Sequence, residues 1–276
     1  MSRRRLNRIG INLLGLLVFA VMVFPVYWMV ATAFKEGRNI LADTPQFFPS
    51  PATLSNFEDA ISRPYFWDVI KNSLLVVTAV VAFSLLVGFL AALALAKFRF
   101  HGRAAFIVLI LGVQMLPLNA LIIPLYIQLS RAGLTNQLSG VIITYLTFVL
   151  PFTVWTLRGF MLGIPRELEE AAMVDGSTRF GAFVRILLPL VAPGMVATSI
   201  FAFVVAWNEF LIAYVFLNDA EKQTAMVWLA GFTTTRGTEW GPLMASATLI
   251  SLPVLAFFLL IHRKIAFGLT AGAVRG

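Results

Sequence analysis

The residue types that most often do chemistry are scarce in this sequence. It contains no cysteine, so thiolate chemistry and cysteine metal sites are excluded. Its two histidines, His101 and His262, fall at the predicted inner ends of helices, where we interpret them as polar residues at the level of the lipid headgroups. The zinc motif H-E-x-x-H and the nucleophile motif G-x-S-x-G are both absent.

Nucleotide hydrolysis by this chain is also unexpected. A phosphate-binding P-loop requires a lysine directly after glycine. The residues that precede the five lysines are Phe34, Ile70, Ala96, Glu221 and Arg263. We therefore predict that the chain is not an enzyme and holds no cofactor of its own.

One segment concentrates charged groups. Residues 158–189 hold eight of the chain's 34 charged residues (21 basic and 13 acidic), four of each sign. Pro165 suits a first helical position, and the glutamates that follow it suit the first turns of a helix. Gly176 can end that helix in the left-handed conformation, and Ser177 can cap a second one. We predict a helix–glycine–helix elbow within 162–189, a shape that docks against another protein.

The second helix of this elbow should be amphipathic. Its apolar residues recur with helical spacing and are Phe180, Phe183, Val184 and Leu187. An ordinary amphipathic helix lying at the membrane interface is the alternative to a docking helix.

A second polar group falls inside an apolar stretch. Trp207, Asn208 and Glu209 lie about 15 residues into a span expected to begin near Pro193, hence about 22 Å across a ~30 Å core. A carboxylate at that depth normally faces a cavity, a partner or a backbone donor. The three residues are a candidate substrate path or gate, because an aromatic ring can stack on the apolar face of a ligand while the neighbouring amide and carboxylate bind its polar groups. Alternatively, Glu209 holds helices together and Trp207 belongs to the interfacial aromatic belt.

The elements that must position these residues are apolar helices. Hydrophobic residues make up 59% of the 276 and charged residues 12%, against roughly 25% charged in average soluble domains. Six stretches without Asp, Glu, Lys or Arg exceed the ~20 residues that cross a hydrocarbon core. They are Ile9–Phe34, Asn72–Ala96, Ala104–Ser130, Ala132–Leu157, Ile186–Asn208 and Trp240–Ile261. We predict an all-α integral membrane protein with about six transmembrane helices, the fifth running past Glu209 to about Leu217.

Three local features refine this picture. The small residues Gly88, Ala92 and Ala96 recur every four positions, which lets another helix approach closely. Pro117 and Pro124 should each bend the third span. The proline-rich segment 35–71 favours turns and short helices over strands.

The net charge of +8 is best explained as a topology signal. If both termini are cytoplasmic, 14 of the 21 basic residues fall inside and 7 outside. Attraction to membrane lipid can add to this effect, and we expect no nucleic-acid partner. The predicted divisions are a cytoplasmic N-terminus (1–8), a six-helix transmembrane domain (9–262) and a cytoplasmic tail (263–276). The first apolar run is too long for a signal peptide.

The elbow carries a recognisable motif. It reads Glu170-Ala171-Ala172, three residues, Gly176, nine residues, Ile186, one residue, and Leu188-Pro189. In residue type and spacing this resembles the EAA loop of permease subunits from binding-protein-dependent ABC importers. Two further stretches, 207–210 and 268–276, resemble the maltose-type (MalG-like) branch of these sugar permeases.

The resemblance implies a function and a set of partners. The chain would form half of the pore of an ATP-driven importer of sugars or oligosaccharides in a bacterial or archaeal plasma (inner) membrane. A second, related permease subunit would form the other half, an extracytoplasmic binding protein would deliver the sugar, and two ATPase subunits would hold ATP and magnesium. The residues expected to couple to the ATPase are Glu170, Ala171, Ala172, Gly176, Ile186, Leu188 and Pro189.

The resemblance also gives the C-terminal tail a role, as a second contact with the ATPase pair. The residues concerned are Leu269, Thr270, Ala271, Gly272, Ala273, Val274, Arg275 and Gly276. A frayed terminus is the alternative, since glycine-rich ends are commonly disordered.

The competing hypothesis for the whole chain is a secondary transporter or channel driven by an ion gradient. Such carriers place ionisable residues at the midplane and often contain internal repeats. Here Glu209 is the one candidate acid and no repeat is evident. A membrane-embedded enzyme ranks third, because the spans contain no cluster of His, Asp or Glu.

Overall fold

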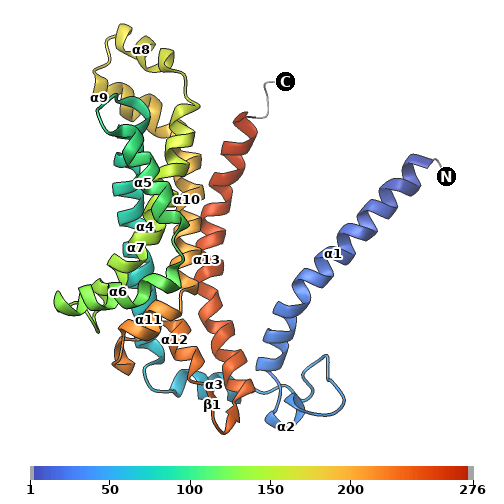
Figure 1. The fold of residues 1–276 in the computed structure, drawn as a ribbon. Coiled ribbons are helices and arrows are strands. Elements are labelled where there is room, and N and C mark those ends of the chain that lie inside the picture. The colour runs from blue at the N-terminus through green and yellow to red at the C-terminus, as the bar shows by residue number, and fades with distance from the viewer. Residues whose placement is uncertain (1–2, 273–276) are drawn as a thin grey trace. The chain divides into compact units, whose positions relative to one another are not determined.

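The structure, a computed structural model, describes the backbone of residues 3–272 and the side chains of residues 9–117 and 119–261. Helices account for nearly all of its regular elements (Figure 1). In order these are α1 (Arg3–Ala33), α2 (Gly37–Ile40), α3 (Ser55–Ser62), α4 (Phe66–Lys97), α5 (Arg103–Met115), α6 (Leu118–Arg131), α7 (Leu138–Leu162), α8 (Arg166–Val174), α9 (Arg179–Ala182), the π-helix η1 (Phe183–Leu187), α10 (Leu188–Asn208), α11 (Leu211–Phe216), the 3₁₀-helix η2 (Ala220–Lys222), α12 (Ala225–Ala230), β1 (Thr233–Thr234), β2 (Gly237–Thr238) and α13 (Trp240–Gly272).

The predicted all-α membrane fold is confirmed. Within the described residues, five helical stretches are long and apolar enough to span a membrane, and a bent helix pair brings the number to six if it counts as one span. The five are Ile9–Ala33, Phe66–Lys97, Leu138–Leu162, Arg179–Asn208 and Trp240–Ile261. Two compact units divide the chain: residues 1–67 with 228–252, and residues 68–227 with 253–276.

The third predicted span is the bent pair, and the expected bend at Pro117 is confirmed, although it divides the span into two helices. Helices α5 and α6 meet at an angle of 107°. The break falls at Pro117, and the preceding Leu116 is extended (ψ 131°), as the clash with a following proline ring favours. Pro124, by contrast, lies inside α6 without ending it. One of the two prolines therefore breaks the span and the other is accommodated.

The fifth predicted span also differs from expectation. It does not run unbroken through Glu209, because α10 ends at Asn208 and α11 begins at Leu211. Glu209 itself is extended, with φ −71° and ψ 126°. The apolar composition on both sides of Glu209 gave no sign of this break.

Small residues let α4 and α7 approach closely in the second unit, as predicted. A Cβ at Gly88 would lie 2.6 Å from Cγ2 of Thr153. A buried apolar cluster continues this contact toward the α8 end of the helices. Its members are Phe89, Ala92, Ala96, Leu157, Met161, Leu187 and Val191.

The first unit holds residues 35–67 of the proline-rich segment, which form the predicted turns and the short helices α2 and α3 before α4 begins at Phe66. Asn56 of α3 donates to the carbonyl oxygens of Ala33 (2.9 Å) and Lys35 (2.7 Å), which fixes the chain after α1. The Lys35 ammonium lies 3.9 Å from the ring centre of Trp28. Burial lowers the pKa of Lys35 below its ordinary value.

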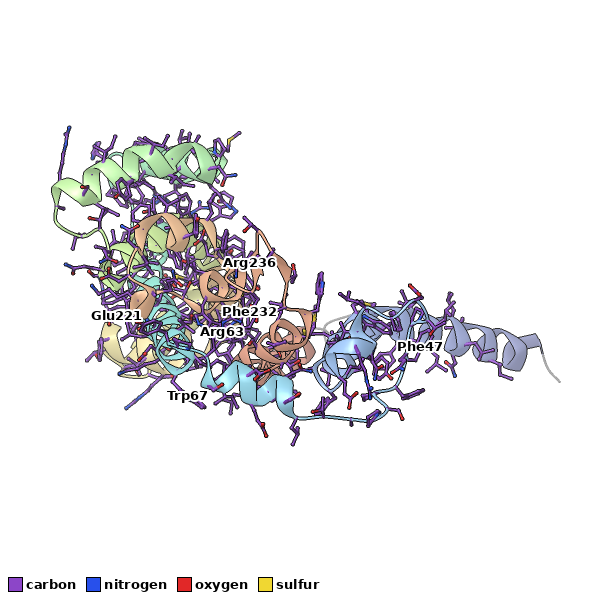
Figure 2. All side chains as sticks on the ribbon, turned by 90° about the horizontal axis from the view of Figure 1, so that it is seen from below. Phe47, Arg63, Trp67, Glu221, Phe232 and Arg236 are labelled. Atoms are coloured by element: carbon purple, nitrogen blue, oxygen red, sulfur yellow. The ribbon has the colours of Figure 1, made fainter. Side chains whose placement is uncertain are left out.

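The same unit contains a cluster of aromatic and charged side chains around Arg63 and Phe232 (Figure 2). The guanidinium of Arg63 lies 4.0 Å from the ring centre of Phe232 and binds both carboxylate oxygens of Glu239, at 3.1 and 3.2 Å. Trp228 donates its indole N–H to the carbonyl of Pro64 at 3.0 Å. The sequence analysis did not predict the short β1–β2 hairpin that follows Phe232.

Candidate functional site

The first arm of the elbow is helix α8. Pro165 directly precedes it with φ −56°, as the N-cap residue and not as the first helical residue we predicted. The restricted φ of proline suits both positions. Glu167 and Glu169 occupy the first turn, as expected, where the helix dipole favours carboxylates.

Gly176 ends this arm as predicted. Its φ of +89° lies in the left-handed region. Its N–H donates to the carbonyl of Met173 (3.1 Å), and the N–H of Ser177 donates to that of Ala172 (2.9 Å). These two bonds form a Schellman motif, which satisfies the last carbonyls of a helix.

The second arm differs from the prediction in two ways. Thr178, and not Ser177, caps it, because the Thr178 hydroxyl accepts a hydrogen bond from the N–H of Gly181 at 3.0 Å. The arm is also no separate helix: α9 continues through the π-helix η1 into α10, so one helical stretch runs over Arg179–Asn208. The continuous helical stretch that contains the fifth span therefore starts well before Pro193, and the elbow's second arm is covalently continuous with α10.

The predicted apolar stripe of the second arm is divided between two environments. Leu187 is buried, and Phe183 packs against the same cluster. Phe180 and Val184 are 74% and 40% exposed. Half of the stripe thus anchors the elbow and the other half remains uncovered within this chain.

Helix α8 buries none of its residues within this chain. Glu170 and Ala171 are exposed, and Val174 is 88% exposed. Glu169 faces the other way: its carboxylate lies 2.6 Å from the ammonium of Lys97, at the end of α4. The surface that α8 leaves uncovered combines acidic and apolar groups.

The remaining predicted coupling residues belong to the second arm or its neighbourhood. Ile186 and Leu188 are half-buried, and Pro189 is exposed in the first turn of α10. The structure thus brings the motif residues together on one elbow at one end of α4, α7 and α10 (Figure 1).

The other candidate group lies at the opposite end of α10, which has 21 residues and is hence about 30 Å long. There the Glu209 carboxylate accepts hydrogen bonds from the hydroxyl of Tyr145 (2.7 Å) and from the N–H groups of Ile212 (2.9 Å) and Ala213 (3.2 Å). The side chain thereby caps α11 and ties it to α7. Backbone donors and a tyrosine satisfy this acid in the way a buried carboxylate requires.

Trp207 and Asn208 have partners within the chain as well. Trp207 is 4% exposed, and its ring stacks on that of Phe203, with ring centres 5.6 Å apart. Asn208 donates its side-chain amide to the carbonyl of Val204 at 2.8 Å. The three residues adjoin in sequence, but each binds a different neighbour.

Comparison with known proteins decides the family. Residues 84–270 match the family described as "Binding-protein-dependent transport system inner membrane component". This range includes the elbow and the helix break at Glu209. The chain belongs to this family. The predicted identity is therefore confirmed: the chain is a multi-pass membrane permease subunit of an ABC importer and is not itself catalytic.

Similar proteins resemble this permease over its whole length. It is 43% identical to the diacetylchitobiose uptake system permease protein DasC of Streptomyces coelicolor, over 100% of both chains. It is 31% identical to the trehalose/maltose transport system permease protein MalG of Thermococcus litoralis, again over 100% of both chains. The predicted MalG-like branch is thus confirmed.

Solved structures show the same fold. A chain in the crystal structure of a bacterial ABC transporter involved in alginate import superposes on the permease with a TM-score of 0.78 and 20% identity. The match covers 95% of this permease and 98% of that chain. At this level of identity the likeness concerns the fold alone.

The remaining predicted contact of the permease is its tail. Helix α13 continues to Gly272, so residues 269–272 extend the last span as helix. Residues 273–276 and all side chains from 262 onward lie outside the described part of the chain, as do the side chains of residues 1–8. The role of the C-terminal tail in binding an ATPase stays a prediction.

Two site residues of the permease escaped the sequence analysis. Neither Lys97 nor Tyr145 was predicted to belong to a site. Each contacts a glutamate more than 60 positions away, Glu169 and Glu209 respectively. Short-range spacing cannot reveal such pairs. Within the described residues, no three His, Cys, Asp or Glu side chains gather as they would around a metal ion.

Proposed function

We propose that this permease imports a di- or oligosaccharide at the expense of ATP hydrolysed by a separate subunit. The observation that carries the proposal is the elbow: a motif-bearing helix that is held at both ends yet buries none of its own residues. The names of the relatives support a sugar substrate, since they specify diacetylchitobiose and trehalose/maltose. Trehalose is also named for SugB of Mycobacterium tuberculosis, 34% identical over 95% of this chain.

The exposed surface of the elbow is where we place the ATPase. Glu170 and Ala171 lie on this surface. Val174 and Phe180 add exposed apolar area, which a bound partner would shield from water. The small side chain of Ala171 lets the helix enter a cleft. Glu170 offers a carboxylate to a basic group of the partner. In this proposal the two ATPase subunits hold ATP and magnesium, and the elbow end of the helices is cytoplasmic, as are both termini.

The other partners are a related permease subunit, membrane lipid and an extracytoplasmic sugar-binding protein. Support for the binding protein comes from a similar fold, a bacterial alginate ABC transporter solved in complex with an alginate pentasaccharide-bound periplasmic protein (TM-score 0.68, 17% identity). The apolar window of α1 is 0% buried within this chain. Its apolar side chains are therefore available to contact lipid or a second subunit.

At the other end of α10 we propose a structural or gating role for Trp207, Asn208 and Glu209. The Glu209 carboxylate fixes the start of α11 after the break in the fifth span. The position of this break would determine the shape of the substrate path at that depth of the membrane. The stacking of Trp207 on Phe203 favours this role over direct sugar contact by the Trp207 ring.

Stimulation of the ATPase tests the proposal. The permease is co-expressed with a Walker-A-containing ATPase and a partner permease encoded beside it, purified, and assayed with the cognate binding protein and its sugar. We expect hydrolysis to rise only when the loaded binding protein is present. Ala171→Trp should abolish this rise, whereas Ala105→Trp, at an exposed alanine of α5, should preserve it. Stimulation that persists in Ala171→Trp would contradict the coupling role.

The competing hypothesis, a secondary transporter driven by an ion gradient, predicts a different outcome. Such a protein would purify without an ATPase, and an ionophore alone would abolish its uptake activity.

A further inference from the structure

The coupling helix α8 is joined to α4 by one short ion pair. Lys97 is the last residue of α4, and its ammonium lies 2.6 Å from a carboxylate oxygen of Glu169. The same ammonium lies 3.5 Å from the carbonyl oxygen of Ile164, just before α8 begins. The side chains are 12% and 25% exposed, so water screens this pair much less than a surface pair.

Apolar contacts contribute little to holding α8 against α4. A hollow of about 470 Å³ borders the ion pair and is lined by residues of α4, α8, α9 and η1, among them Leu93, Met173 and Phe183. No residue of α8 is buried. The ion pair therefore joins α8 to α4 at the edge of this hollow, where few other contacts between the two helices are available.

The ends of both helices favour the charges they carry. Lys97 lies in the last turn of α4, where the helix dipole stabilises a cation, and Glu169 lies in the first turn of α8, where it stabilises an anion. Either charge left alone at this degree of burial would be unfavourable. Both effects tend to keep the pair closed when the elbow is displaced.

We propose that the Lys97–Glu169 pair is a positioning link that makes the coupling helix move together with α4. This inference rests on the proposed coupling role of the elbow. Helix α4 packs against α7 at Gly88 and Thr153, so the link would carry a displacement of α8 into two spans besides α10. Lys97 and Glu169 act through the elbow and need not touch the ATPase, ATP or the sugar.

Charge reversal tests the link. In the reconstituted complex, Lys97→Glu and Glu169→Lys should each lower the sugar transported per ATP hydrolysed by about fivefold or more, the lower end of typical allosteric coupling. The double exchange, Lys97→Glu with Glu169→Lys, should restore most of this ratio. Arg38→Glu breaks a more exposed ion pair, with Glu36, and should leave the ratio unchanged.

The outcomes separate a positioning role from a merely structural one. If the single variants retain the wild-type ratio, the proposal is overturned. If they fail to assemble with the ATPase, the double exchange decides, because recovery of assembly and ratio supports the pair and continued failure contradicts it. A wild-type complex without binding-protein-stimulated hydrolysis would instead refute the proposed function.

A thiol cross-link gives an independent measurement, since the chain contains no cysteine that could interfere. The variant Lys97→Cys with Glu169→Cys lacks the ion pair and should show the same loss as the single reversals. Joining the two thiols with a short bis-maleimide should restore the ratio, because a covalent bridge also makes α8 and α4 move together. Failure to cross-link, or a bridge that abolishes the remaining transport, would show that the helices are apart or must separate.

Discussion

The Tyr145 hydroxyl of α7 donates a hydrogen bond to the Glu209 carboxylate at 2.7 Å, at the break in the fifth span between α10 and α11. The same carboxylate accepts the first free N–H groups of α11, from Ile212 and Ala213. One acidic side chain thus satisfies a helix start and fixes it to a neighbouring span. This explains how a charge-bearing residue is accommodated between apolar helices.

Replacing Glu209 should separate these contributions. Glu209→Ala removes both carboxylate oxygens, leaves only the backbone carbonyl near the Tyr145 hydroxyl (3.5 Å), and should destabilise the fold by about 1–3 kcal/mol, the cost of leaving buried donors unsatisfied. Glu209→Gln keeps a carbonyl acceptor and should cost less, while Tyr145→Phe removes one bond and should cost about 1 kcal/mol. Thermal unfolding of the detergent-solubilised complex and sugar uptake measure both effects. Equal, near-normal behaviour of the alanine and glutamine variants would make Glu209 incidental.

Gly176 should tolerate no side chain, although space is available. A Cβ there would meet nothing within 4 Å, so any penalty comes from the φ of +89°. The left-handed conformation costs other residues about 1–2 kcal/mol, and Gly176→Ala should lower sugar-stimulated hydrolysis while leaving the subunit in the membrane. Gly176→Pro should be more severe. Gly159→Ala, on an open face of α7, should be neutral, and equal rates for both alanine variants would argue against a fixed elbow angle.

The contact of α4 with α7 should be sensitive to one methyl group. A Cβ at Gly88 would lie 2.6 Å from Cγ2 of Thr153, whose hydroxyl is bonded to the carbonyl of Val149 at 3.0 Å. Rotation of Thr153 away from the clash would break that bond. Gly88→Ala should therefore destabilise the permease by about 1–3 kcal/mol, measurable as a lower thermal midpoint. Gly15→Ala, which meets nothing within 4 Å, is the matched control, and an unchanged midpoint for Gly88→Ala would refute the close approach.

Deletion of Leu269–Gly276 tests the predicted tail contact. The truncated subunit should still insert into the membrane, because the deletion starts beyond the spanning stretch that ends at Ile261. Co-purification of the ATPase should weaken, or its stimulation should change. Full co-purification with normal uptake would leave the tail as a frayed end.

Local signals predicted the parts of the site that depend on neighbouring residues. The turn at Gly176 was predictable because glycine is the residue that most readily adopts the left-handed conformation. The choice of Ser177 over Thr178 as cap was wrong since both carry a hydroxyl, and only the backbone geometry distinguishes them. The six apolar stretches predicted the spans by length and composition alone.

Distant contacts could not be predicted in this way. Asn136 shows the difficulty: its side chain accepts from the N–H groups of Asn218 and Asp219 and donates to the Asp219 carboxylate, 83 positions along the chain. Hydrogen bonds from Lys222 and Asn136 lower the pKa of Asp219. No short-range pattern marks such an asparagine. The break at Glu209 and the Lys97–Glu169 pair were missed for the same reason.

ATP-dependent uptake into proteoliposomes tests the central claim most directly. The permease, its partner permease and the ATPase are reconstituted with ATP inside the vesicles, and the binding protein with radiolabelled sugar is added outside. We predict that sugar accumulates with ATP, does not accumulate with a non-hydrolysable analogue, and still accumulates when an ionophore has collapsed the ion gradients. Accumulation that needs no ATP and disappears with the ionophore would contradict the account.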